Sequence, residues 1–380
     1  MRHLNVNGKA PAPASDHADG TAIRQHYADV VLPAWRTVGF DRRLGLPHES
    51  LQWQSPEVGV TPIASTRYRA MACARQLFVF SEAGDRAHAD HLFASLVDYF
   101  QDEEQGGFIF SVDSSGKPLD TSKDLYTHAF VIFACAAYLR RFGVTAAGQV
   151  ARNTATVIDA SFPVDPDHGL PAALASRDFR ESHVGARQNP LMHLAEAYLM
   201  ASGAGAGALF DTALATLLEG VSRTFSDPRS RCILELPRDM AENRIEPGHQ
   251  FEWFYLAYGS NHPAFRHTGM NEALAAAFAF AQNHGVETET GGVLAALTLE
   301  GTVIDASQRI WAQTEYLRAL ACHPDAAQRN RLAAQIERFR SRFLHPHGWH
   351  ESLTSQQGMG RTDMPSTTPY HLQGAYAALP

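Results

Sequence analysis

The sequence is poor in lysine and cysteine. Lys9, Lys117 and Lys123 are the only lysines in 380 residues, so candidates for a Schiff-base nucleophile are few and a Gly-Lys-Ser/Thr phosphate loop is absent. The four cysteines are scattered without a Cys-x-x-Cys pair, which argues against both a zinc site and a disulfide framework. No apolar run approaches the roughly 18 residues that a membrane span requires.

Positive charge is also scarce. The net charge is -8, and basic residues form no cluster, so we expect neither nucleic acid nor an anionic membrane surface as a partner. A hydrophobic content of 45% is typical of a globular protein with a sizeable core. Residues 1–18 are polar and lack the apolar core of a signal peptide. We therefore expect a flexible leader at 1–18, a single domain at 19–380 and a cytoplasmic location.

A repeat of about sixty residues runs through the chain. Gly-Leu-Pro-His-Glu-Ser-Leu at 45–51 has an echo in Gly-Trp-His-Glu-Ser-Leu at 348–353. Between these two copies, a turn followed by apolar residues recurs at 106–110, 168–171, 231–234 and 291–294. Two of the copies continue into hairpin patterns, at 111–119 and 295–304.

Helical segments fill the intervals between these turns, two to each interval. A pair of helices cannot bury its apolar faces alone, so the pairs must stack, and six pairs can close into a ring. We predict an all-α fold, an (α/α)6 barrel, with short β-hairpins in the loops at one mouth and the helix after each hairpin on the inside. The expected helices are 19–38, 66–83, 87–101, 125–142, 145–159, 187–203, 206–224, 250–258, 270–284, 308–322, 326–343 and 369–379.

Polar residues recur at the same position of each expected inner helix, which should bring them to one cavity. Each has a structural alternative, such as an ion pair or a satisfied core histidine, which is the reading we favour for His128. The Gly-x-Gly-x-x-Ala sequence at 203–208 follows a helix rather than a strand, so we interpret it as a helix connection. The recurring residues are Arg75, Tyr126, His128, Asn189, His193, Glu196, His249, Glu252, Arg309, Gln313, Glu315, Tyr370 and His371.

Three chemistries suit such a cavity. The spacings His193-x-x-Glu196 and His249-x-x-Glu252 could supply metal ligands, although no third ligand lies nearby in sequence. A glycoside hydrolase would use two carboxylates, but the group is richer in histidine than in aspartate. Proton transfer at a carbon next to a carbonyl requires an acid and a base that titrate near neutral pH, and the unperturbed histidine pKa of about 6.5 fits that requirement.

Three motifs resemble those of the N-acylglucosamine 2-epimerase superfamily, most closely its D-mannose and sulfoquinovose isomerase branch. They are Asn-Pro-Leu-Met-His-Leu-Ala-Glu at 189–196, Pro-Gly-His-Gln-Phe-Glu-Trp at 247–253 and Pro-Tyr-His at 369–371. The resemblance implies an (α/α)6 barrel that transfers a proton at C2 of a sugar, with no metal and no cofactor. It also implies that His249 and His371 are the acid/base pair, and that substrate is bound or oriented by Arg75, Tyr126, Asn189, His193, Arg244 and Glu252.

Our leading hypothesis is an isomerase that interconverts D-mannose and D-fructose through a cis-enediol(ate). In this hypothesis Glu252 orients His249, and Glu196, Trp311 and Glu315 are further substrate-binding candidates. A sugar 2-epimerase using the same histidines is the alternative, and an inverting glycoside hydrolase is a more distant one. The expected partner is a monosaccharide, with a homodimer as a possible assembly.

Overall fold

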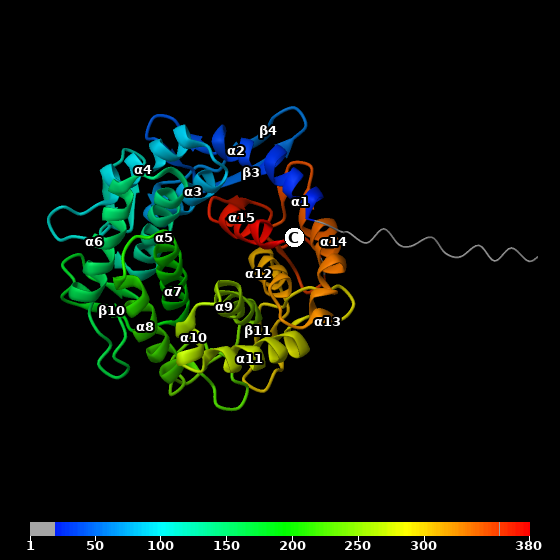
Figure 1. Ribbon diagram of the computed structural model, residues 1–380. Helices are drawn as coiled ribbons and strands as arrows, with labels where there is room; N and C mark the ends of the chain where they lie inside the picture. The colour runs from blue at the N-terminus through cyan, green and yellow to red at the C-terminus, as the bar shows by residue number, and fades with distance from the viewer. Residues whose placement is uncertain (1–19, 357) are drawn as a thin grey trace, which may run out of the picture.

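The computed structural model describes residues 20–356 and 358–380. The helices of this part of the chain form two concentric rings (Figure 1). The leader expected at 1–18 lies outside the described residues. The inner ring consists of α3 (Ala70–Glu82), α5 (Leu125–Phe142), α7 (Gln188–Gly203), α9 (Pro247–Ser260), α12 (Ile310–Ala321) and α15 (Thr368–Ala378). The outer ring consists of α1 (Thr21–His26), η1 (Tyr27–Val31), α2 (Leu32–Arg36), α4 (Arg86–Phe100), α6 (Thr145–Ser161), α8 (Leu209–Phe225), α10 (Pro263–His267), α11 (Met270–Gly285), α13 (Ala326–Arg329) and α14 (Leu332–Phe343).

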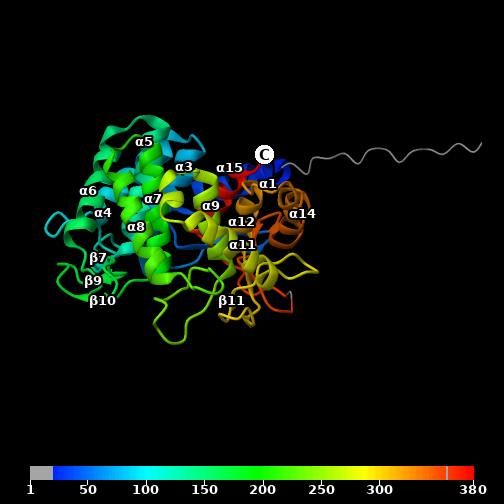
Figure 2. The same cartoon turned by 60° about the horizontal axis from the view of Figure 1, so that its bottom comes forward.

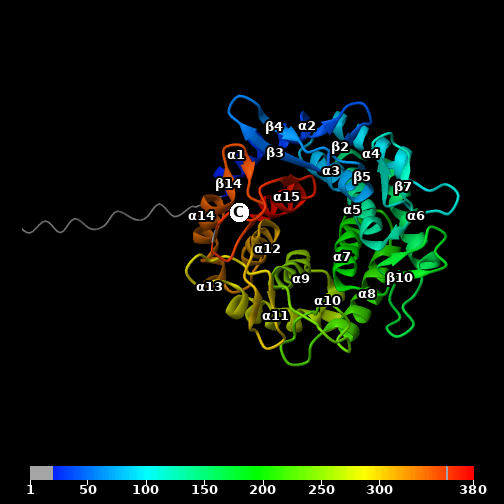
Figure 3. The ribbon, with the colours of Figure 1, turned by 180° about the vertical axis from the view of Figure 1, so that it is seen from behind.

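The inner ring is closed. Each inner helix packs against the next one along the chain, and the last, α15, packs against the first, α3. Figure 3 shows the same closure from behind. Inner helices such as α5 are buried on nearly all sides because they lie between the centre of the barrel and an outer helix. The outer helix α14 buries only one face. The predicted (α/α)6 barrel is therefore confirmed.

Several helix ends differ from the sequence prediction. Helix α9 begins at Pro247, three residues earlier than expected, because proline at the first turn needs no hydrogen-bond partner for its nitrogen. The segment expected as one helix at 19–38 contains the π-helical turn η1, and the one at 326–343 is divided into α13 and α14. The 203–208 segment joins α7 to α8 as predicted.

Short antiparallel strands form a collar on one side of the ring (Figure 2). Strand β5, before α3, pairs with the hairpin that precedes α5, and β8, before α5, pairs with the hairpin that precedes α7. Strands β17 and β3 join the two ends of the collar. The strands are β1 (Phe40–Asp41), β2 (Leu46–Pro47), β3 (Ser50–Ser55), β4 (Gly59–Pro62), β5 (Arg67–Arg69), β6 (Ser111–Asp113), β7 (Pro118–Asp120), β8 (Lys123–Asp124), β9 (Leu174–Ala175), β10 (Ser182–Val184), β11 (Ala296–Leu297), β12 (Val303–Asp305), β13 (Gln308–Arg309), β14 (Leu344–His345), β15 (Gly348–Trp349), β16 (Ser352–Leu353) and β17 (Met364–Pro365).

The repeated turn in the sequence has one structure in four copies. After each of α4, α6, α8 and α11, an acidic residue accepts a backbone hydrogen bond from the residue four positions later, which lies at positive φ. That residue is glycine in three copies and Arg231, at φ 64°, in the fourth. Two positions later, an apolar residue forms an isolated antiparallel β-bridge with a residue just beyond the end of the outer helix. The turn thus directs the chain from each outer helix into the collar.

No helix within the described residues is both long enough and apolar enough to traverse a lipid bilayer.

Candidate active site

A cavity of about 290 Å³ lies where the N-terminal ends of the inner helices meet the collar. Helix N-termini carry partial positive charge, so this end of the barrel favours a ligand on which negative charge develops. The lining residues come from all six inner helices and the loops before them. They are Arg75, Tyr126, Asn189, His193, Glu235, Arg244, Glu246, His249, Glu252, Arg309, Trp311, Glu351, Thr367, Thr368 and His371.

His249, the third residue of α9, is held through its Nδ1. That nitrogen lies 2.7 Å from Glu235 Oε1 and 2.8 Å from Gln188 Nε2. When protonated it donates to Glu235, which leaves Nε2 as the ring nitrogen for the cavity. The Trp311 ring lies against the imidazole, with centroids 4.9 Å apart. Burial lowers the pKa of His249, but the charge and hydrogen bond of Glu235 outweigh burial, and the pKa is raised above 6.5. The protonated imidazolium is therefore favoured, as a general acid requires.

His371, near the start of α15, is held in the same way but in a different electrostatic environment. Its Nδ1 donates to Glu315 Oε1 at 3.0 Å. Glu315 also accepts from Arg318 Nη1 at 2.8 Å, so its charge is largely neutralised. Burial, followed by the positive charge of Arg75, lowers the pKa of His371 well below 6.5. The neutral imidazole is therefore favoured, as a general base requires.

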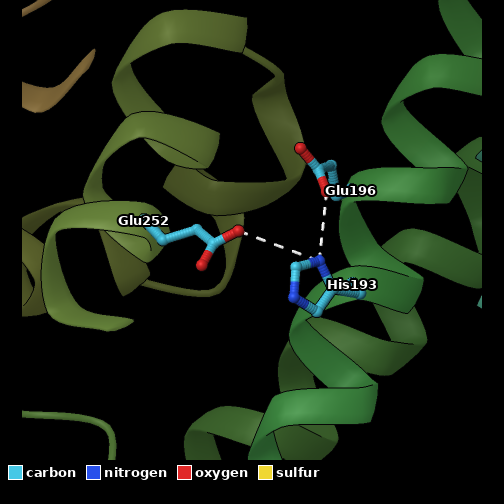
Figure 4. Close-up of side chains that lie close together, drawn as sticks. All are labelled: His193, Glu196 and Glu252. Carbon is cyan, nitrogen blue, oxygen red and sulfur yellow. Dashed lines mark hydrogen bonds and ion pairs between the residues drawn. The ribbon is translucent and has the colours of Figure 1, made fainter. Parts of the chain in front are cut away.

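Glu252 faces His193 on the neighbouring helix α7 (Figure 4). Its Oε1 lies 3.8 Å from His193 Nδ1, which donates to Glu196 Oε2 at 3.2 Å. Both Glu252 oxygens are buried without a hydrogen-bond partner among the described residues. Burial and then the nearby charge of Glu315 raise the pKa of Glu252 well above its ordinary value, so it is a neutral acid that can donate to a ligand hydroxyl. The prediction that Glu252 orients His249 is wrong, since Glu235 occupies that position.

Arg75 enters the cavity from the middle of α3 through an aromatic cage. Its guanidinium carbon lies 4.1 Å from the Phe130 ring centroid and 4.7 Å from that of Tyr370. One nitrogen donates to Tyr126 Oη at 2.6 Å and another to the carbonyl of Thr367 at 3.3 Å. The cage fixes a positive charge beside the neutral His371.

The remaining predicted residues fall into two groups. Asn189, His193, Arg244 and Trp311 line the cavity as expected, with Arg244 at the rim donating to Glu246 at 2.7 Å. Glu196 and Glu315 are not among the residues that line the cavity. They lie behind the lining side chains, where Glu196 accepts from His193 and Tyr370, and Glu315 accepts from His371. The structure therefore places these two as supports of other side chains, not as direct substrate contacts.

Sequence reasoning missed seven residues of the site and its supports. Glu235 and Gln188 are buried polar residues that hold His249, and Arg318 holds Glu315. The others line the cavity and are Glu246, Glu351, Thr367 and Thr368. Glu351 had a signal, because it belongs to the His-Glu-Ser-Leu echo at 350–353. Glu235, between apolar neighbours in an irregular loop, had none.

Carboxylates and imidazoles come within 4.8 Å of one another in three groups, each with enough ligand atoms for a metal ion. The groups are His193 with Glu196 and Glu252; Glu235 with Glu246 and His249; and Glu252 with Glu315 and His371. Of the two pairs expected from sequence, His193 and Glu196 lie together in the first group, whereas His249 and Glu252 share none.

Comparison with known proteins places the chain among sugar-converting enzymes. It is 29% identical to mannose-6-phosphate isomerase of Rhizobium meliloti (strain 1021), over 90% of this chain and 92% of that one. It is 31% identical to cellobiose 2-epimerase of Eubacterium cellulosolvens, over 41% of this chain and 40% of the relative. A D-mannose isomerase crystal structure superposes with a TM-score of 0.80 at 20% identity, covering 96% of this chain and 98% of that chain, which shows the shared fold.

The sequence model for N-acylglucosamine 2-epimerase matches residues 59–375, a span that includes five complete inner helices and most of α15. The cavity, its two histidines and the closed helical ring all lie within this match. The chain belongs to the N-acylglucosamine 2-epimerase family, whose members are sugar epimerases and isomerases.

Proposed function

We propose that this protein is an aldose–ketose isomerase that interconverts D-mannose and D-fructose. The observation that carries the proposal is that two buried histidines face one cavity with opposite pKa shifts. A 1,2-proton transfer needs such an acid and base together, each in the correct protonation state at neutral pH.

The reaction begins from the open-chain aldose. His371 Nε2 removes the C2 proton, and the electrons of that C–H bond form the C1–C2 double bond. The C1 carbonyl oxygen receives a proton from the His249 imidazolium, which gives the enediol. In the second half, His249 takes the O2 proton, C2 becomes the carbonyl carbon, and His371 returns its proton to C1. The histidines end in their starting protonation states.

The cavity is suited to the enediol(ate) in two ways. The N-terminal ends of the inner helices direct their partial positive charge at it, and these fixed dipoles stabilise oxygen charge as it develops. Arg75 supplies a full positive charge, and the neutral acid of Glu252 supplies a donor. The aromatic face of Trp311, beside both histidines, is a surface for the sugar carbons.

The charges around the cavity favour a neutral sugar over a sugar phosphate. Arg75 is hydrogen-bonded to Tyr126 within its aromatic cage, and Arg244 is paired with Glu246. Arg309 is the guanidinium of the lining that has no carboxylate partner among the described residues. Glu235 and Glu351 add acidic groups to the lining. A phosphate dianion would therefore meet more carboxyl groups than free cations, and like charges in a cavity disfavour binding. We infer that mannose rather than mannose 6-phosphate is the substrate.

The test is a substrate panel with NMR identification of products. D-Mannose should give D-fructose, and mannose 6-phosphate should react at least about tenfold less efficiently in kcat/KM, a difference of about 1.4 kcal/mol. Glucose as the main product from mannose would favour the 2-epimerase alternative. New reducing ends from an oligosaccharide would indicate a hydrolase, and loss of activity with EDTA would support a metal-dependent reaction.

A further inference from the structure

Glu235 is the carboxylate that holds His249, although it lies outside the inner helices and no sequence motif marks it. We propose that Glu235 is a positioning residue that keeps His249 in its imidazolium form with Nε2 directed into the cavity. The catalytic consequence rests on the proposed function, whereas the effect on the ring itself does not. Glu235 belongs to the 226–246 loop between α8 and α9, so this loop would control the acid of the reaction.

Glu235 is itself fixed by a buried relay. Trp253 Nε1, one helical turn beyond His249 on α9, donates to Gln188 Oε1 at 3.0 Å. This bond determines the orientation of the amide, so that Gln188 Nε2 donates to both Glu235 oxygens at 3.1 and 3.2 Å and also lies 2.8 Å from His249 Nδ1. Because this nitrogen cannot accept, a proton on Nδ1 is directed to Glu235. Trp253 and Gln188 are fully buried, and Glu235 is 8% exposed. The relay leaves the Glu235 carboxylate little freedom to turn away from His249.

The two histidine–carboxylate pairs differ in one respect that matters chemically. Glu315 shares its charge with the Arg318 guanidinium, so little net charge acts on His371. Glu235 is held by a neutral amide, and its hydrogen bonds among the described residues include no cation other than His249 itself. Its full negative charge therefore acts on His249. This difference in pairing, together with the positive charge of Arg75 beside His371, separates the pKa values of the two imidazoles in opposite directions.

Other groups face His249 from the elements packed around it. Glu246, at the N-cap of α9, has Oε2 3.7 Å from Nδ1 and also accepts from Arg244. Arg309, before α12, opposes protonation of the ring. Glu246 is thus a second carboxylate beside the same nitrogen, but it is farther away and already paired with a cation. It provides a matched control for Glu235.

The test compares Glu235→Gln with Glu235→Asp and Glu246→Gln, without substrate and then with mannose. We expect Glu235→Gln to lower the pKa of the His249 ring. This pKa is measured by NMR titration of the Cε1 proton, whose signal is assigned by its loss in a His249→Asn variant. We also expect kcat to fall about tenfold or more, and the alkaline limb of the pH profile to move to lower pH, because the acid form is lost earlier. Glu235→Asp should leave the pKa of His249 closer to its wild-type value than Glu235→Gln does. Glu246→Gln should also shift this pKa less than Glu235→Gln does.

Two results would overturn the proposal. One is an unchanged His249 titration in Glu235→Gln, and the other is an equal shift in Glu246→Gln. If Glu235→Gln does not fold, Glu235→Asp decides the question, since retraction of the carboxylate by one methylene should still slow kcat while thermal unfolding stays near wild type. The titration requires no substrate, so its outcome is independent of whether mannose is the correct sugar.

Discussion

His249 and His371 have the same side chain, the same depth and the same mode of support, yet opposite pKa shifts. Both donate Nδ1 to a glutamate, and both are more than nine-tenths buried. What differs is the second partner of each glutamate, an amide for Glu235 and a guanidinium for Glu315. In the proposed mechanism these partners, together with Arg75 beside His371, determine which histidine is the acid and which is the base.

These shifts predict a bell-shaped dependence of kcat/KM on pH. Activity requires neutral His371, whose pKa lies well below 6.5, so the acid limb falls only when the pH drops below that lowered value. It also requires protonated His249, whose pKa lies above 6.5, so the alkaline limb falls as the pH rises through that raised value. Steady-state kinetics across the pH range should show a plateau that spans 6.5. A single limb centred within that plateau would contradict the assignment.

At the scale of single residues, the sequence predicts the side chains that reach the cavity from the inner helices, but not the side chains that support them. His249, His371, Arg75 and His193 recur at one helical phase, and the periodicity alone brings them together. Glu235 lies in an irregular loop, where the sequence contains no period to indicate its direction. The spacing on one helix predicts that Glu252 orients His249, but the side chain points to His193 on the neighbouring inner helix α7.

At the scale of elements, the collar depends on the turn that follows each outer helix. The acidic residue at its start accepts from backbone N–H groups within the turn, as Asp165 does from Asp167 and His168. The residue at the fifth position adopts the left-handed conformation that glycine tolerates best. Arg231 occupies this position in one copy, with its side chain exposed.

Arg231→Gly should therefore stabilise the protein. Relief of the left-handed strain is worth about 1–2 kcal/mol, and the greater freedom of glycine in the unfolded chain offsets about 0.5–1 kcal/mol. The net expectation is a gain in the free energy of unfolding of up to about 1 kcal/mol, measured by denaturant titration.

Gly169→Ala is the matched control, because Gly169 holds the same position in another copy. An added Cβ there would meet no atom closer than 3.9 Å, so only backbone strain is introduced, and we expect destabilisation. A loss of stability in Arg231→Gly would show that the arginine side chain contributes more than its backbone costs.

The sequence predicts these elements well where a repeat marks them. The turns follow from the recurring pattern of a turn followed by apolar residues, and the long inner helices from their apolar content. The helix ends follow less well, because α9 extends back to Pro247 and strand β5 takes the residues before α3. Strand pairing within the collar joins segments that are distant in sequence, and no local pattern specifies it.

At the scale of the whole molecule, the ring is what brings the two histidines together. His249 and His371 are 122 positions apart in the chain, on α9 and α15, and α12 lies between these helices with Trp311 against both rings. The count of six helix pairs predicts that the ring closes, but the packing of α15 on α3 is visible only in three dimensions. Because every inner helix contributes its N-terminal end, one cavity collects groups from the entire chain.

The most direct test of this account is hydrogen exchange at C1 and C2 during turnover of D-mannose in D2O, followed by NMR. The wild-type enzyme should introduce deuterium at C1 of fructose or C2 of mannose. His371→Asn should abolish this exchange, and His249→Asn should slow it at least about a hundredfold, since loss of a general acid or base costs that much or more. Exchange at the wild-type rate in His371→Asn, or fructose formation at the wild-type rate in His249→Asn, would contradict the assignment of the two histidines as base and acid.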